Sequence, residues 1–579
     1  MGGPWLAGGS PLGYARDLRP LAAGSARREF LLAPQAAARN PPLRPLAPGG
    51  ETGRDVGATE QPGRRSSGYL LPVFTGILVG TSTIPFPPWA LFVCLVPLWL
   101  FWLGEVSWKR ILLGGWIAQF VFTLIGFHWV AHTAHEFGHL SWPAATLALF
   151  LFCCVAHLFL PLSGLLWSLL RARGNLPRWA QLGLLPAVTA LCWHYSPMIF
   201  PWHLGYAWLW GKLPAFQLAE YVGFSGLSAL TVFLNLAILV AWENRAARRG
   251  MRVLGAGLAF LIAINALGWL RGGNLPSPDA EMRVLIVQAN IGNLAKERAE
   301  KGQEFREEIL KKYFALTAKG WTASKGRPDF VLWPESAFPD TVRMDRMDEG
   351  NTLVLRGFLR SHGIPLVTGA RGFDEAAGKE TNAFFLFEGN GKALAFPYRK
   401  TMLLAFGEYL PGAVLFPGLK AWFPRTADFA RGRGPEVKSF SGLTLGPQIC
   451  YEGLFPWFSR SLADQGAVAF VNVTNDSWFG TWSEPHQHLF MTLARGIEFR
   501  RPVIRATNTG ISTVMLADGT ILDRSPLHRE WFHTFNVPYR KEPPPTFYQG
   551  YGFRLVPAIL LLTAGILLAT GRGKRKGVS

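Results

Sequence analysis

The sequence predicts two fold classes in one chain, an all-α membrane domain and an α/β domain inserted between its last two helices. Hydrophobic residues make up 49% of the 579 residues and charged residues only 17%, with 23 tryptophans. This composition is more typical of membrane proteins than of soluble ones. Long apolar segments fill residues 68–271 and recur near 553–571, whereas strand-like and helical patterns alternate between them, in 272–552.

Residues 1–66 precede the first apolar segment and are rich in Gly, Pro, Ala and Arg. They show no periodic apolar pattern, and such a composition cannot bury a core. They also lack the long apolar stretch that a secretory signal peptide carries. These residues are therefore predicted to form a disordered N-terminal extension.

Eight apolar segments are predicted to cross a membrane as helices, seven of them within residues 67–271. Several approach the ~20 residues that a bilayer-spanning helix needs, and the first two are short and interrupted by proline. The segments lie near 69–84, 88–104, 111–132, 143–170, 178–198, 224–242, 253–271 and 553–571.

Basic residues alternate between the two ends of these predicted helices. They cluster at 64–65, 109–110, 171–178, 245–252 and 572–576. The intervening loops carry almost no charge, so the positive-inside rule places both termini in the cytoplasm. Residues 272–552 then lie on the extracytoplasmic face, and 553–579 form the last span and a basic cytoplasmic tail. The net charge of +20 is thus attributed to topology and not to nucleic-acid binding.

The inserted segment 272–552 is predicted to be one layered α/β domain, since about 270 residues is a size that one domain can hold. Strands are predicted at 283–288, 330–333, 366–369, 383–387, 443–449, 467–473, 503–506 and 512–516. Helices are predicted at 297–318, 351–361, 455–464 and 487–499.

Three side chains with catalytic chemistry stand at the ends of strand-like runs: Glu335, Lys400 and Cys450. Side chains at strand ends can converge on one pocket although they are far apart in sequence. A carboxylate near a thiol can act as its general base, and an ammonium can stabilise an oxyanion. Taken singly, Glu335 could equally cap a helix and Lys400 could be a solvated loop charge.

Cys450 is the one cysteine of five outside the apolar segments, so no disulfide partner is available to it within 272–552. The helix predicted to follow it would place the thiol at a helix N-terminus, where the partial positive charge favours the thiolate. The alternative is that Cys450 is a small buried apolar residue.

In combination, these residues resemble a known family. The order WPE (Trp333–Glu335), YRK (Tyr398–Lys400) and CYE (Cys450–Glu452) is similar to the Glu–Lys–Cys arrangement of the nitrilase, or carbon–nitrogen hydrolase, superfamily. Four further stretches, with membrane spans on both sides, resemble the bacterial apolipoprotein N-acyltransferases over 68–571. These stretches are FPWHLGYAW (200–208), LLAFGEYLPG (403–412), TNDSWFG (474–480) and RPVIRATNTG (501–510).

The resemblance implies a nitrilase-like αββα sandwich between spans seven and eight and a role for each matching residue. Cys450 would be the nucleophile, Glu335 the general base and Lys400 the group that stabilises the oxyanion. Glu408 matches a second carboxylate of the family's site, and Tyr451 and Glu452 match supporting residues. No cofactor and no metal is implied.

The implied reaction moves an acyl chain from a phospholipid, expected to be phosphatidylethanolamine, to the α-amino group of a diacylated apolipoprotein. The chain would pass through a thioester on Cys450, in a ping-pong sequence at the bacterial inner membrane. Two positions depart from the family pattern, because Ala405 replaces its usual proline and no tryptophan occurs in 292–300. These departures bear on lid shape and lipid positioning.

The stretch 402–423 is apolar but is broken by Pro411, Gly412, Pro417 and Gly418. Such a hinged apolar loop after Lys400 predicts an arm that dips into the membrane interface. The alternative is that it packs on the domain. The side chains proposed to contact lipid are Leu403, Leu404, Phe406, Phe416 and Trp422.

Other readings compete with this one. His135, Glu136 and His139 fit the HExxH zinc motif of metalloproteases, although Gly138 lies inside the motif and no third ligand is evident. His486 and His488 would face apart on a helix and are predicted to be structural or solvent-facing. The nitrilase fold could also belong to a membrane-bound amidase for small amides, or to a non-catalytic scaffold.

Overall fold

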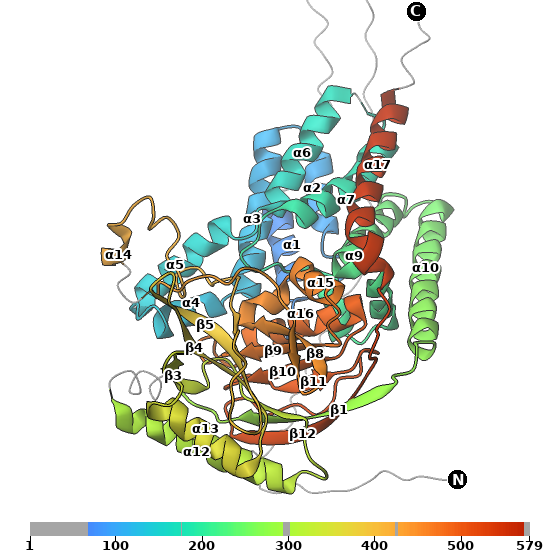
Figure 1. The fold of residues 1–579 in the computed structure, drawn as a ribbon. Helices are drawn as coiled ribbons and strands as arrows, with labels where there is room; N and C mark the ends of the chain where they lie inside the picture. Colours follow the sequence, from blue (N-terminus) through green and yellow to red (C-terminus); the bar gives the residue numbers. More distant parts are fainter. Residues whose placement is uncertain (1–67, 175, 293–301, 423–425, 573–579) are drawn as a thin grey trace, which may run out of the picture. The chain divides into compact units, whose positions relative to one another are not determined.

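The computed structural model describes residues 68–174, 176–292, 302–422 and 426–572. The predicted N-terminal extension and most of the stretch without a tryptophan, 292–300, lie outside these residues. The chain has two parts: the helical part, which comprises residues 70–273 and 548–572, and the sheet domain, which comprises residues 280–539 (Figure 1).

The helical part begins with seven helices before the chain turns back toward the sheet domain. They are α1 (Leu70–Gly80), α2 (Val96–Gly104), α3 (Trp108–Gly126), α4 (Trp129–Glu136), α5 (Trp142–Val155), α6 (Phe159–Gly174) and α7 (Arg178–Tyr195). The rest are α8 (Tyr206–Trp210), η1 (Pro214–Leu218), α9 (Ala219–Glu243), α10 (Arg248–Gly273), η3 (Tyr548–Gly552) and α17 (Phe553–Arg572).

Four helical segments among the described residues are long and apolar enough to cross a membrane. They are Trp108–Gly126, Pro214–Glu243, Arg248–Gly273 and Tyr548–Gly571. Shorter apolar helices lie at Leu70–Gly80, Trp142–Val155 and Phe159–Ala172. The chain therefore contains an α-helical part of the kind that a bilayer accommodates.

The single span predicted at 143–170 is wrong in detail, because the chain breaks there between α5 and α6. At the break, the backbone of His157 pairs with Met198, and the buried His157 imidazole lies 3.1 Å from the Thr123 hydroxyl. The His157 backbone is bonded to Met198 instead of to its own helix, and its polar ring has a partner on α3. Both features interrupt the series of helical hydrogen bonds.

The sheet domain contains two sheets, in strand order β12-β1-β2-β4-β5-β6, with β3 on β4, and β11-β10-β9-β8-β7. The first sheet comprises β1 (Ala280–Gln288), β2 (Phe330–Leu332), β3 (Phe338–Val342), β4 (Leu366–Asp374), β5 (Lys379–Phe387), β6 (Tyr398–Arg399) and β12 (Trp531–Tyr539). The second comprises β7 (Lys438–Phe440), β8 (Leu443–Ile449), β9 (Ala469–Thr474), β10 (Val503–Thr507) and β11 (Thr513–Met515).

All eight predicted strands and all four predicted helices are present. The helices are α12 (Gln303–Ala323), α13 (Gly350–His362), α15 (Pro456–Asp464) and α16 (Glu484–Phe499), with short α14 (Leu419–Trp422) and η2 (Cys450–Leu454) besides. Four strands were not predicted. Of these, β3, β6 and β7 have at most five residues, and β12 pairs antiparallel with β1 along its length although His533, Asn536 and Pro538 interrupt its apolar pattern.

Successive side chains of β1 point to opposite faces of the first sheet and show how the layers stack. Val284 and Ile286 belong to the core shared with the second sheet, whereas Leu285 and Val287 pack in a separate core with α12 and α13. On the other side of the second sheet lie α15 and α16 (Figure 1). The domain is thus a sandwich in the order helix, sheet, sheet, helix, as the resemblance to the nitrilase superfamily implied.

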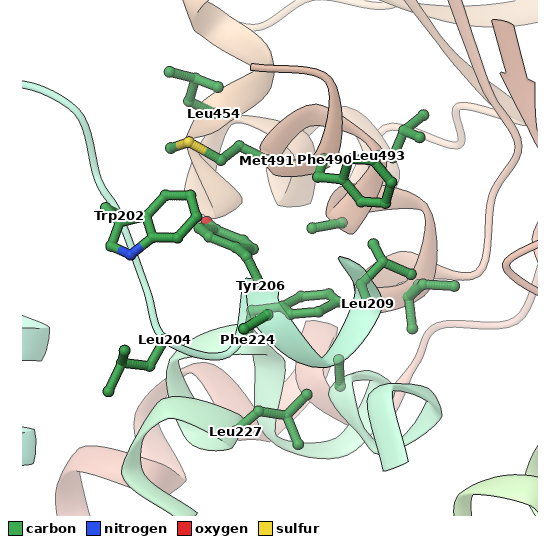
Figure 2. Close-up of a cluster of buried hydrophobic side chains, with 14 of the residues drawn as sticks. Trp202, Leu204, Tyr206, Leu209, Phe224, Leu227, Leu454, Phe490, Met491 and Leu493 are labelled. Carbon is green, nitrogen blue, oxygen red and sulfur yellow. The ribbon is translucent and has the colours of Figure 1, made fainter. Parts of the chain in front are cut away.

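The helix α16 joins the sheet domain to the helical part. Gln487 on α16 accepts a hydrogen bond from Trp129 Nε1 (3.1 Å) and donates to the carbonyl of Gly126 (2.8 Å). Figure 2 shows Trp202, Leu204, Tyr206, Leu209, Phe224 and Leu227 of the helical part packed around Leu454, Phe490, Met491 and Leu493 of the sheet domain. One apolar core therefore continues across both parts.

Candidate active site

Cys450 lies at the junction between β8 and the 3₁₀ helix η2, in a sharp backbone turn. Its φ of 52° is in the left-handed region, which a non-glycine residue adopts only where its surroundings impose it. The Cys450 carbonyl is held by the imidazole of His488 at 3.3 Å and by the Asn472 amide at 3.4 Å. The turn directs the thiol out of the strand, at a fixed place.

Glu335 and Lys400 lie together although 65 positions separate them in sequence. Lys400 Nζ donates to Glu335 Oε1 at 3.1 Å and to Glu408 Oε1 at 2.8 Å. The amide of Asn382 bonds to both carboxylates at 2.7 Å, and the backbone N–H of Asn475 donates to Glu335 Oε2 at 2.9 Å. Asn382 and Asn475, which fix the carboxylates in place, were not predicted from the sequence.

These charges surround the thiol. Burial raises the pKa of the Cys450 thiol well above its usual range, the Glu335 carboxylate raises it further, and Lys400 lowers it. Burial lowers the pKa of Lys400, but Glu335 and Glu408 outweigh burial, so the ammonium stays charged. The predicted preference for a resting thiolate is wrong, because Cys450 is buried and is followed by a single 3₁₀ turn instead of a long helix. The thiol needs a base.

Glu452 is buried and ties the loop after Lys400 to the Cys450 turn. Its carboxylate accepts hydrogen bonds from the backbone N–H groups of Thr401 (2.6 Å) and Ile449 (2.8 Å) and from the Tyr398 hydroxyl (2.7 Å). Glu452 therefore fixes the Lys400 ammonium and the Cys450 thiol relative to each other.

Tyr451 faces the helical part instead. Its hydroxyl donates to the backbone carbonyl of Ile199, and its ring meets the Phe200 ring edge-on at 5.8 Å. The residue that follows the thiol is thus anchored to the segment between α7 and α8.

A narrow apolar pocket of about 20 Å³ lies beside Cys450. Its walls come from both parts of the chain. The helical part contributes Phe127, Trp129 and Phe200. The sheet domain contributes Leu404, Tyr451, Leu454, Phe479 and Met491, and the first turns of α16 contribute Glu484, Gln487 and His488. The thiol therefore opens onto a space that the helical part helps to enclose.

The residues predicted to form a lipid arm fall into different environments. Leu403 is buried in the domain, and Leu404 lines the pocket. Phe406 and Phe416 are exposed, at 54% and 67%, beside Val414 at 96%. The side chain of Trp422 lies outside the described residues.

A buried charged cluster behind the Cys450 turn was not predicted. The His488 imidazole lies 3.0 Å from Asp476 and 3.3 Å from Glu484, and Arg505 donates to the other oxygen of Asp476 at 2.9 Å. His488 is therefore structural and not solvent-facing. The cluster has a geometry that could attract a cation, but Arg505 already neutralises Asp476. His486, on the same turn, is only half-buried.

The HExxH motif does not form a zinc-binding helix. The helix α4 ends at Glu136, so His135 and His139 do not share a helical face, and His139 has a φ of 50°. The His135 imidazole lies 2.7 Å from the Leu140 carbonyl and stacks on Trp142. The structure therefore does not support the metalloprotease alternative.

Comparison with known proteins adds sequence relatives to this geometry. Residues 283–531 match the family model described as carbon-nitrogen hydrolase, and 75–237 match that of the apolipoprotein N-acyltransferase N-terminal domain. The apolipoprotein N-acyltransferase of Bdellovibrio bacteriovorus is 43% identical over 86% of this chain and 93% of its own length. This chain belongs to the apolipoprotein N-acyltransferase family.

Other apolipoprotein N-acyltransferases are more distant, such as that of Pseudomonas aeruginosa, 31% identical over 79% of this chain and 88% of the relative. Among solved structures, the amidase from Nesterenkonia sp. AN1 aligns with 20% identity and a TM-score of 0.32, over 47% of this chain and 98% of that chain. Membership in the apolipoprotein N-acyltransferase family makes the chain an acyltransferase with a carbon–nitrogen hydrolase domain.

Proposed function

We propose that this protein moves an acyl chain from a phospholipid to the α-amino group of the diacylglyceryl-cysteine of apolipoproteins, through a thioester on Cys450. The observation that carries the proposal is the pocket beside Cys450, which is walled by Phe127, Trp129 and Phe200 of the helical part. At about 20 Å³ the pocket has room only for the reacting end of a lipid, which would meet the thiol there in apolar surroundings. Extracting an acyl tail into water would cost about 0.8 kcal/mol per CH₂.

In the first half-reaction, Cys450 Sγ attacks the ester carbonyl carbon and passes its proton to Glu335. Lys400 and the backbone N–H of Tyr451, which is in the first turn of η2 and has no intrahelical acceptor, stabilise the oxyanion. The C–O bond then breaks, and Glu335 returns the proton to the leaving oxygen. The products are the thioester and a lysophospholipid.

In the second half-reaction, the neutral α-amine of the acceptor attacks the thioester carbonyl carbon. The C–N bond forms, the C–S bond breaks, and one amine proton passes through Glu335 to Sγ. Cys450 returns to the thiol state that its burial favours. Water must stay away from the thioester meanwhile, and the apolar lining of the pocket serves that need.

We further propose the topology expected from the charge pattern. Residues 1–66 form an extension, 67–271 seven spans, 272–552 the extracytoplasmic catalytic domain, and 553–579 the eighth span and tail. Both termini are then in the cytoplasm, and the protein resides in the inner membrane. The four long apolar helical segments and the continuous core between the two parts support this arrangement.

The exposed segment 413–416 is the part of the proposed arm best suited to contact lipid. Val414, Leu415 and Phe416 expose 96%, 78% and 67% of their surface between Gly412 and Gly418. Consecutive exposed apolar side chains of this size are typical of membrane or partner contacts.

Mass spectrometry of the purified full chain tests the function. After incubation with phosphatidylethanolamine, Cys450 is expected to carry one acyl group, and a diacylated lipopeptide with a free amine is expected to discharge it. The Cys450→Ala variant carries none. Hydrolysis of a small amide without an acyl adduct from phospholipid would favour the amidase reading instead.

A further inference from the structure

The pocket beside Cys450 contains one acidic side chain, and its position is unexpected. Glu484 lies in the first turn of α16 and exposes only 3% of its surface. It lines the same apolar pocket as Cys450, with Phe479, Leu454 and Met491 nearby in the wall. A carboxyl group in such a place costs free energy unless it has a partner or a use.

The other polar side chains in the pocket wall are already bonded. Gln487 uses its amide nitrogen and oxygen on Gly126 and Trp129, and the Tyr451 hydroxyl donates to Ile199. His488 bonds to Asp476 and to the Cys450 carbonyl.

Glu484 differs from them. Its Oε1 lies 3.3 Å from the His488 imidazole, but its Oε2 is buried and has no hydrogen-bond partner among the described residues. A carboxylate oxygen without a partner, on a residue that lines the same pocket as the nucleophile, is suited to a ligand that donates a hydrogen bond or carries positive charge.

We infer that Glu484 binds the α-ammonium group of the acceptor in the pocket beside Cys450 and removes its proton. The inference rests on the proposed function. A primary ammonium is also present in the ethanolamine head group of the proposed donor. Only the acceptor's nitrogen must come within bonding distance of the thioester carbon, and only that nitrogen must lose a proton to react.

Glu484 would take up the proton that the acceptor must lose. An acceptor arrives as R–NH₃⁺, which has no lone pair and cannot attack. One proton passes to Glu484 Oε2, giving R–NH₂ and a neutral carboxyl. The amine then forms the C–N bond as the C–S bond breaks, its second proton reaches Sγ through Glu335, and Glu484 releases its proton to solvent. The net change is thioester plus ammonium giving amide, thiol and one proton.

The charges around Glu484 suit a reversible proton acceptor. Burial and the neighbouring Asp476 carboxylate raise the pKa of Glu484 and outweigh His488 and Arg505, which lower it, so that the pKa is raised to about 7. A general acid–base group works best with a pKa near the operating pH.

The test measures the two half-reactions separately in wild type and in Glu484→Gln. Cys450 of the variant should still be acylated by phosphatidylethanolamine, which shows that the variant is folded. Discharge to the lipopeptide at pH 7 should be about tenfold slower, because only about a tenth of an α-amine with a pKa near 8 is neutral there. The deficit should vanish at pH 9, and Glu484→Asp should recover part of the rate.

Hydroxylamine supplies the control nucleophile, because it is uncharged at pH 7 and should discharge both enzymes equally. His486→Gln, which alters the same turn outside the pocket, should match wild type throughout. The inference is overturned if wild type and Glu484→Gln discharge the thioester to the lipopeptide at the same rate. It is also overturned if Glu484→Gln is slowed as much with hydroxylamine as with the lipopeptide. Slower adduct formation from phosphatidylethanolamine but not from phosphatidylglycerol, which would assign Glu484 to the donor, overturns it as well. If wild type forms no adduct, the proposed function fails first.

Discussion

The ammonium nitrogen of Lys400 lies 3.1 Å from Oε1 of Glu335, and their side chains expose only 2% and 6% of their surface. The same ammonium binds Glu408 at 2.8 Å. One buried cation therefore holds two carboxylates that would otherwise repel each other in a medium of low dielectric constant.

Replacing Lys400 with methionine should both destabilise the protein and abolish acylation. The variant leaves Glu335 and Glu408 buried without a counter-charge, and breaking a buried pair typically costs about 3–5 kcal/mol. Thermal unfolding in detergent and the acyl adduct on Cys450 are the measurements. Lys312→Met is the matched control, because its ion pair with Glu530 exposes 32% and 53% of the two side chains to solvent and should contribute less than about 1 kcal/mol. Equal unfolding of the two variants would contradict the ion-pair argument.

Glu335→Gln should fold normally but acylate slowly. The amide oxygen can still accept the hydrogen bonds that Lys400 and Asn382 donate to Oε1. Only the bond from the Asn475 N–H to Oε2 is lost, so most of the geometry persists. It cannot take the thiol proton, and removing a positioned base typically costs about 10²–10⁴-fold in rate. Single-turnover acylation followed by mass spectrometry gives the rate. An adduct that forms at the wild-type rate would mean that another group deprotonates Cys450.

The stability of the protein should fall between about pH 6.5 and pH 9 through His488. Burial and Arg505 lower the pKa of His488, but the Asp476 and Glu484 carboxylates outweigh them and raise it to about 9. A folded pKa above the unfolded value of ~6.5 stabilises the fold below pH 6.5, and this stabilisation is lost as pH rises through 9.

A rise of the His488 pKa from 6.5 to about 9 corresponds to roughly 3 kcal/mol of stability. Unfolding temperatures of wild type and His488→Gln, measured every half unit from pH 6 to pH 10, should therefore converge at the alkaline end. A constant difference between the two proteins across this range would show that His488 is neutral in the fold.

The exposed segment 413–416 should matter for lipid substrates and not for folding. Leu415→Ser and Phe416→Ser together remove apolar surface that the folded protein leaves in contact with solvent. We expect unchanged unfolding temperature and a higher KM for phospholipid in vesicles at constant kcat. Phe396→Ser is the control, since Phe396 exposes 79% of its surface outside the segment. If Phe396→Ser raises KM as much as the double variant, the loss does not depend on segment 413–416.

The sequence predicted the regular elements of the sheet domain because their apolar patterns are long and local. All eight predicted strands recur, whereas β6 has only two residues and forms because β5 offers it an edge. The same limit applies to β12, whose partner β1 lies some 250 positions earlier in the chain. Pairing at such a separation leaves no local pattern.

Some residues of the candidate site could likewise be predicted from the sequence, and others only from the fold. Glu335, Lys400 and Cys450 stand at strand ends and were identified from motif order, but Asn382 is an ordinary residue of β5 whose role comes from the two carboxylates facing it. His488 belongs to a helix face that the sequence shows to be partly apolar, and only the fold places Asp476 beside it. Thiol ionisation also depends on burial, which motif order does not encode.

Gly369 provides a test of how tightly Glu335 is positioned. Gly369 lies in β4 against the turn that follows β2, and a Cβ atom there would come within 2.5 Å of the Glu335 Cα and 2.8 Å of the Pro334 carbonyl oxygen. Both atoms are backbone, so the turn must move. Gly369→Ala should therefore lower the acylation rate at least about tenfold and cost about 1–3 kcal/mol of stability.

The matched control is Gly357→Ala, on the exposed face of α13, where a Cβ would meet nothing within 4 Å. There the substitution should stabilise the helix by up to about 1 kcal/mol and leave acylation unchanged. Because both variants add one methyl group, the difference between them measures what displacement of Glu335 does to the reaction. If Gly369→Ala acylates as fast as Gly357→Ala, the carboxylate tolerates movement and its placement by β4 is not required for proton transfer.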